Sequence, residues 1–145
     1  MGGVTVRRWA EFASDLPEDQ IEDENDIVQF GGKSVAEAIH EVLGRLGCER
    51  DPVTYAHEHG WEFNFRYKKR RLWCQVTLIE DYLCVVEDTS FFDKLFGRHH
   101  PDYLEIMTNF SRELAQHPRF RNVRWYFDHQ VHSGEPGAKE PVAAA

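Results

Sequence analysis

The most constraining feature of the sequence is the alternation of apolar and polar residues between Trp61 and Asp88. Successive side chains of a strand point to opposite faces of a sheet, so this alternation is typical of half-buried strands. Three consecutive runs show it and predict an antiparallel three-stranded meander. The apolar residues of the first two runs are Trp61, Phe63, Phe65, Tyr67 and Leu72, Cys74, Val76, Leu78. The third run alternates Leu83 and Val85 with Tyr82, Cys84 and Val86.

Loop length decides which residues of the third strand are buried. Two-residue loops at 69–70 and 80–81 would place apolar residues opposite one another in all three strands. On that register Leu83 joins the buried face, whereas Trp73 and Tyr82 project from the opposite face. Neither loop contains the Gly or Asn that two-residue turns prefer, so longer or bulged loops are the alternative.

Two amphipathic helices are expected to cover the buried face. The first spans Val35–Leu46, with Ser34 as N-cap of a capping box and Gly47 as its end. The second spans Asp102–Gln116, and a strand at Asn122–Asp128 follows it. After a helix, a crossover to a position parallel to an earlier strand is more natural than a hairpin. The predicted fold class is α+β: a two-layer sandwich in which an antiparallel three-stranded meander plus a fourth strand packs on two main helices, in the order α-β-β-β-α-β.

The domain prediction is a single α+β domain over residues 34–128 with less regular flanks. Residues 1–33 contain an acidic run, and the stretch Val4–Leu16 favours a short helix. Residues 129–145 combine Gly, Pro and an Ala-rich end with nothing to bury, which is typical of a disordered tail. Thr89–Gly97 reads as one or two helical turns.

Length, hydropathy and cysteine usage favour a cytoplasmic protein. No apolar run approaches the roughly 18 residues that cross a bilayer, and residues 1–12 lack the apolar centre of a signal peptide, so no membrane partner is expected. Cys48, Cys74 and Cys84 have no paired spacing, which favours buried, reduced thiols. The same register places Cys74 in the core and Cys84 on the opposite face, too far apart in orientation for a disulfide.

Charge is concentrated in two segments. Seven acidic residues and no basic residue lie from Asp15 to Asp26, and without them the chain of net charge −8 is almost neutral. Five cations lie within residues 66–71, next to Trp73. Three roles are compatible with this basic hairpin. It can be a solvated tip whose charges deter aggregation, it can contact an acidic protein partner or the chain's own acidic segment, or it can contact nucleic acid. Overall acidity makes nucleic acid the least favoured partner, because carboxylates repel phosphate.

The sequence predicts no catalytic residues, no metal ligands and no cofactor. Gly31–Ser34 resembles the end of a phosphate-binding loop, but Ile27 stands where that motif requires Gly, and a helix start explains the segment. Its backbone amides could still hold an anion. His57-Glu58-His59 has the wrong spacing for a helical zinc motif.

The layout resembles small α/β binding proteins such as secretion chaperones and some toxin-immunity proteins, a resemblance that implies a protein partner or self-association. The absence of catalytic patterns and the contacts offered by Trp73, Tyr82, the acidic run and the basic hairpin give the leading hypothesis. It is a non-catalytic cytoplasmic protein-binding module, a chaperone-like or immunity-like adaptor for which a homodimer is one option. The expected binding surface consists of Trp73, Tyr82, Ile79, Arg66, Lys68, Arg70 and Arg71. Alternatively, the N-terminal segment with Trp9 and Phe12 covers the Trp73 face. A nucleic-acid-binding protein that uses the 66–71 hairpin with Trp73 and Tyr82 is the second hypothesis, and a metal-dependent hydrolase that uses histidines is the third.

Overall fold

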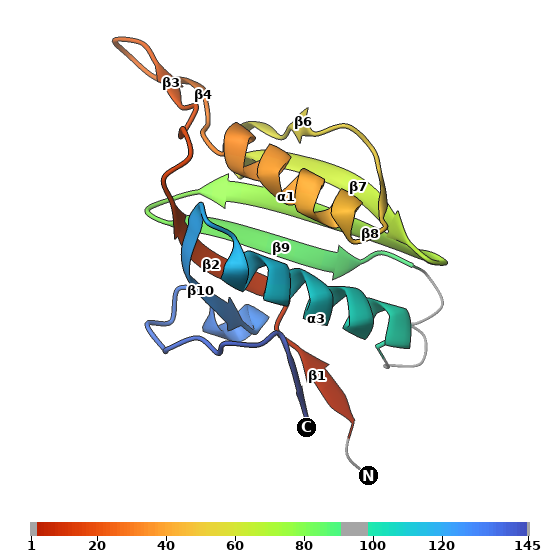
Figure 1. The fold of residues 1–145 in the computed structure, drawn as a ribbon. Helices are drawn as coiled ribbons and strands as arrows, with labels where there is room; N and C mark the ends of the chain where they lie inside the picture. Colours follow the sequence, from red (N-terminus) through yellow and green to blue (C-terminus); the bar gives the residue numbers. More distant parts are fainter. Residues whose placement is uncertain (1–2, 91–98, 145) are drawn as a thin grey trace.

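One antiparallel sheet organises the structure, a computed structural model that describes residues 3–90 and 99–144 (Figure 1). Its strands lie side by side in the order β10 (Phe120–Tyr126), β2 (Trp9–Ser14), β9 (Tyr82–Asp88), β8 (Arg70–Leu78), β7 (Trp61–Tyr67) and β5 (Glu49–Arg50). The short β6 (Thr54–Tyr55) pairs with the same edge of β7 and completes seven strands.

Two helices cover one face of this sheet. The first helix, α1 (Lys33–Arg45), lies over β7 and β8, and α3 (Pro101–Gln116) lies over the half that contains β10 (Figure 1). Both predicted helices and their apolar stripes are confirmed. The buried residues are Val35, Ile39, Val42 and Leu43 in α1 and Tyr103, Ile106, Met107, Phe110 and Leu114 in α3.

The predicted sandwich of a three-stranded meander plus a fourth strand on two helices is wrong. The described residues form eleven strands and two α-helices, and most strands belong to the seven-stranded sheet. The stretch predicted as an N-terminal helix contains β2, which lies between β9 and β10. Its burial has a period of two, because Ala10 and Phe12 are buried whereas Trp9 and Glu11 are partly exposed. β10, the strand for which a parallel crossover was predicted, is antiparallel to β2.

The β8–β9 connection corrects the predicted faces of β9. It contains three residues, 79–81, in place of two, and an odd loop reverses the face on which alternate residues of the next strand lie. Tyr82 and Cys84 therefore point toward the helices, and Leu83 points away from them. The β7–β8 turn is 68–69 and not 69–70, but that two-residue shift in pairing leaves the faces unchanged.

The predicted placement of Cys74 and Cys84 on opposite faces is wrong for the same reason, whereas the prediction of buried, reduced thiols agrees with three free, buried cysteines. Cys74 and Cys84 lie on one face of the sheet, with their Sγ atoms 3.6 Å apart. Both thiols are free and buried, as is Cys48. Burial raises the pKa of Cys74 well above its usual value and that of Cys48 to about 12. These two thiols are therefore protonated at neutral pH and are poor nucleophiles.

The capping prediction for the start of α1 is wrong, and the one for its end is correct. Gly32, with φ of 113°, is the N-cap, and the Ser34 side chain does not cap the helix. The Asp19 carboxylate instead accepts a hydrogen bond of 2.7 Å from the Ser34 amide, so the chain supplies its own anion at this end. At the other end Gly47 has φ of 95°, and the Cys48 amide donates to the Leu43 carbonyl at 3.1 Å.

Outside this sheet the described residues form two further sheets of two strands each. The acidic run contributes β3 (Ile21–Glu22), which pairs with β4 (Ile27–Gln29) in a hairpin that projects from the body (Figure 1). At the chain ends β1 (Val4–Val6) pairs with β11 (Val142–Ala144). The C-terminal segment, for which disorder was predicted, thus contains a strand and also η2 (Asp128–Gln130). The turns predicted at Thr89–Gly97 lie mostly outside the described residues.

Candidate functional site

The face of the sheet turned away from α1 and α3 is called the outer face here. Strand pairing places Trp73 between Glu87 and Asn64 on this face, and the next row places Gln75 between Val85 and Glu62. Asn64 is exposed, and Trp73 and Gln75 are partly exposed. No described helix crosses this part of the outer face, so its side chains are available for contact.

Trp73 is the large aromatic residue at the centre of this open area. Its indole N–H makes no hydrogen bond to a protein group among the described residues, and Asn64 beside it carries a solvent-facing amide. Gln75 donates to Glu62 at 2.9 Å, which fixes the second amide of the area. The result is one indole with the Asn64 and Gln75 amides on one side and Glu87 opposite it on β9, a combination of an aromatic ring and hydrogen-bonding groups that is common at protein interfaces.

The chain covers the other half of the outer face with its own C-terminal segment. Leu83 and Val85 are only 5% and 2% exposed. A cavity of about 330 Å³ lies between Leu83 and the segment, and Val131 and His132 belong to its lining. The hypothesis that the N-terminal segment covers the sheet does not describe this arrangement, because β2 is itself a strand of the sheet.

Polar contacts fasten η2 to the outer face. Asp128 accepts hydrogen bonds of 2.7 Å from Arg8 Nε and 2.8 Å from Trp9 Nε1. Arg8 also pairs with Glu87 at 3.1 Å. The hydrogen bond from the Arg8 guanidinium lowers the pKa of the Asp128 carboxyl, which favours its charged form at neutral pH.

The predicted surface around Trp73, Tyr82 and Ile79 is not one surface. Tyr82 is 3% exposed and faces the helices, where its ring stacks on Phe12 with centroids 5.9 Å apart. Burial raises the pKa of its hydroxyl to about 12. Ile79 is 59% exposed but lies in the β8–β9 loop, at the end of the sheet opposite the β7–β8 turn. Only Trp73 of these three remains on the open part of the outer face.

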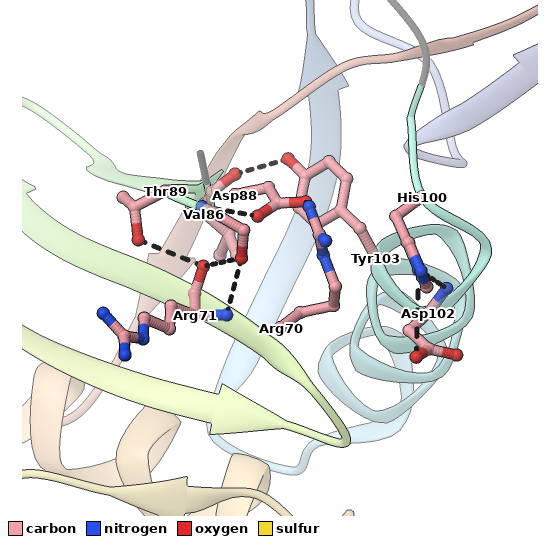
Figure 2. Close-up of polar contacts among 9 residues, drawn as sticks. Arg70, Arg71, Val86, Asp88, Thr89, His100, Asp102 and Tyr103 are labelled. Atoms are coloured by element: carbon pink, nitrogen blue, oxygen red, sulfur yellow. Dashed lines mark hydrogen bonds and ion pairs between the residues drawn. The ribbon is translucent and has the colours of Figure 1, made fainter. Parts of the chain in front are cut away.

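Arg70 is also absent from the surface. It is 8% exposed, and its Nη2 lies 2.7 Å from Asp88 Oδ2 (Figure 2). Above this ion pair the Tyr103 hydroxyl donates to the Val86 carbonyl at 2.7 Å, which fixes α3 to the end of β9. Arg70 is therefore part of the packing between sheet and helix. Figure 2 shows that the neighbouring Arg71 side chain is directed away from this pair.

Two further cations of the β7–β8 turn are paired with carboxylates. Arg66 contacts Asp51 at 3.1 Å and Glu49 at 3.4 Å. Lys68 contacts Glu105 of α3 at 2.8 Å. These contacts raise the pKa of both basic groups, mainly through the hydrogen bonds to Asp51 and Glu105.

Lys69 and Arg71 differ from the other three cations of the turn. Neither side chain forms an ion pair within the part of the chain that the structure describes, and both are exposed. All five cations line a shallow cavity of about 540 Å³ beside the turn. Arg71 also lies directly opposite Arg66 in the β7–β8 ladder, so two like charges face each other.

The alternation of β7 and β8 predicted Asn64 and Gln75 on the same face as Trp73, and the strand pairing confirms this. Neither was predicted as a binding residue, because Tyr82 and Ile79 were expected to complete the surface. For the metal hypothesis, the described residues contain no group of three His, Cys, Asp or Glu side chains that could hold an ion. Within the same residues, no helix has both the length and the apolar character to cross a membrane.

Comparison with known proteins gives no relative. The chain matches no model of a protein family, no curated protein and no solved structure.

Proposed function

We propose that this chain is a non-catalytic protein-binding module whose partner docks on the outer face around Trp73. The observation that carries the proposal is the division of that face into two halves. The C-terminal segment lies over the half that contains Leu83 and leaves a cavity of about 330 Å³ there, whereas the half over β7 and β8 keeps a partly exposed indole among polar side chains.

The chemistry of the open half suits a protein partner. Tryptophan is enriched among the residues that dominate binding energy, and a ring of polar contacts around it excludes water. Asn64 offers both an amide donor and an acceptor, and charged residues such as Glu87 and Arg71 lie at the edge. As part of the same proposal the module acts in the cytoplasm, which three free cysteines support.

A nucleic acid on the basic turn has less support. A phosphate at Arg66 or Lys68 would compete with carboxylates already in contact with those groups, and Arg70 is buried against Asp88. Only Lys69 and Arg71 would gain a first partner among the described residues. Because phosphate contacts supply most of the nonspecific affinity, two such cations favour weak binding.

The proposal is tested by site-specific photo-crosslinking. A benzophenone amino acid replaces Asn64 on the outer face, and a matched variant carries it at Thr108, an exposed position on α3. Each full-length variant is irradiated in extract of the source cells, and crosslinked proteins are identified by mass spectrometry. We expect a protein that crosslinks at position 64 and not at position 108.

Affinity of the identified protein then provides the quantitative test. Trp73→Ala is expected to weaken its Kd by roughly 30-fold or more, the effect of a central interface tryptophan. Thr108→Ala serves as the control and should leave the Kd unchanged. Equal crosslinking at both positions, or an unchanged Kd for a folded Trp73→Ala variant, would refute docking on the outer face.

A further inference from the structure

The cavity beside the β7–β8 turn carries unneutralised positive charge. Lys69 and Arg71 line it, both exposed and without an ion pair among the described residues, and the Arg71 guanidinium is directed away from the Arg70–Asp88 pair (Figure 2). Arg66, which lies opposite Arg71, already contacts Asp51 and Glu49, and Glu49 also lines the cavity. An anionic group in this cavity would therefore pair with Lys69 and Arg71.

The acidic hairpin, β3–β4 with its connecting tip, carries the complementary charge. Glu22, Asp23, Glu24 and Asp26 are exposed and form no ion pair within the described residues. Two other acidic residues of the run have structural partners, because Asp15 pairs with Arg119 and Asp19 caps α1. The unpaired negative charge of the acidic run is thus concentrated at the hairpin tip.

The hairpin also carries apolar side chains that the rest of the chain does not cover. Ile21 is 50% exposed and Val28 is 58% exposed. An isolated two-stranded hairpin has only marginal stability in water, so contact with another surface would stabilise it. A partner that combines positive charge with the aliphatic stems of Lys and Arg matches both properties.

These two features lie at opposite ends of the molecule. Figure 1 shows the acidic hairpin projecting beyond the start of α1, whereas the β7–β8 turn lies past the far end of that helix. The acidic hairpin of one copy therefore cannot reach the β7–β8 turn of the same copy. We propose that the cavity at the β7–β8 turn binds the acidic hairpin of a second copy, so that the chain associates head to tail.

This association uses a surface different from the Trp73 area and does not rest on the proposed partner there. Because the two contacting patches differ, a pair of copies retains one free hairpin and one free turn, and further copies can add. The contact is electrostatic and exposed to solvent, so salt weakens it.

The test exchanges charges at positions outside the internal ion pairs. One full-length variant carries Lys69→Glu and Arg71→Glu, and the other carries Glu22→Lys and Glu24→Lys. Sedimentation velocity gives the mass distribution of wild type, of each variant and of their equimolar mixture. Protein concentrations run from about 1 to 200 μM, at about 50 mM and about 500 mM salt. Circular dichroism verifies that each variant is folded.

Wild type is expected to shift to larger species with concentration at low salt and to lose them at high salt. Each variant alone should remain monomeric. In the Lys69→Glu/Arg71→Glu variant the turn gains negative charge like that of the hairpin, and in the Glu22→Lys/Glu24→Lys variant Asp23 and Asp26 balance the two lysines, so the hairpin tip loses its net negative charge. The mixture should form pairs, because the unaltered hairpin of the first variant meets the unaltered turn of the second. Trp73→Ala should associate as wild type does, which separates this proposal from the proposed function.

Three results would overturn the proposal. The first is a wild type that stays monomeric over the whole concentration range at low salt. The second is a Lys69→Glu/Arg71→Glu variant that associates as wild type does. The third concerns nucleic acid as the ligand of the cavity. A single-stranded oligonucleotide of about 20 bases that binds monomeric wild type and loses affinity in the Lys69→Glu/Arg71→Glu variant would assign the cavity to phosphate instead.

Discussion

Phe12→Ala tests whether the N-terminal segment is a structural strand of the sheet. Phe12 is 1% exposed, and its ring centroid lies 5.9 Å from that of Tyr82 and 4.9 Å from that of Phe120. Removing the ring loses its burial, which contributes about 1.5 to 3 kcal/mol, and two ring contacts of about 0.5 to 1.5 kcal/mol each. The sum agrees with the roughly 3 to 5 kcal/mol that Phe→Ala costs in protein cores. We therefore expect a loss of about 4 kcal/mol.

The assay is urea denaturation followed by circular dichroism. With a slope of about 2 kcal/mol per molar urea for a domain of this size, a loss of about 4 kcal/mol lowers the midpoint by roughly 2 M. Val4→Ala is the control, since Val4 is 43% exposed on β1 and its truncation should cost less than about 0.5 kcal/mol. A Phe12→Ala midpoint as close to wild type as that of Val4→Ala would refute the central position of β2.

Three further predictions concern other parts of the fold. Trp61→Ala should cost about 3 to 5 kcal/mol, because Trp61 is 7% exposed and its indole donates to a backbone carbonyl at 3.0 Å; an unchanged denaturation midpoint would contradict this. Gly60→Ala should cost about 2 kcal/mol or more and lower Tm, because Gly60 has φ of 93° and a methyl group there would collide with the Val76 carbonyl. A Tm equal to that of wild type would be inconsistent with this turn. Asp128→Asn should reduce the free energy of unfolding at neutral pH, where Asp128 and Arg8 are both charged. The Asp128 carboxyl has a lowered pKa in the folded protein, so its stabilising effect is lost when it is protonated. The difference in unfolding free energy between wild type and variant should therefore shrink as pH falls below about 4. Denaturation of both proteins over a pH series measures this difference, and its growth toward acid pH would argue against the assignment.

The candidate site was only partly predictable because its residues depend on one loop. Trp73 lies on the outer face as the alternation indicated, since the β7–β8 pairing shifted by two residues and kept its faces. Tyr82 does not, because the three-residue β8–β9 loop reversed the faces of β9. No turn residue in that loop indicated its length, and the choice of two residues rested on matching apolar faces.

The charge of the β7–β8 turn is another property that the local sequence misrepresents. Five cations in six positions suggest a strongly basic surface, but three of them contact carboxylates. Lys68 meets Glu105, which lies 37 positions along the chain, on α3. Arg70 meets Asp88 at the end of β9. The free positive charge is consequently limited, within the described residues, to Lys69 and Arg71.

The sequence by itself determined the elements whose signal is local. The strands β7 and β8 and the stripes of α1 and α3 follow from periodicities of two and 3.6 residues, and their buried residues match them, whereas β9 is buried on both faces. Only the tertiary structure decided where the N-terminal segment belongs. β2 pairs with β9 and with β10, more than 60 and 100 positions away, and such pairing depends on which edges the rest of the sheet leaves free, a property that no local pattern records.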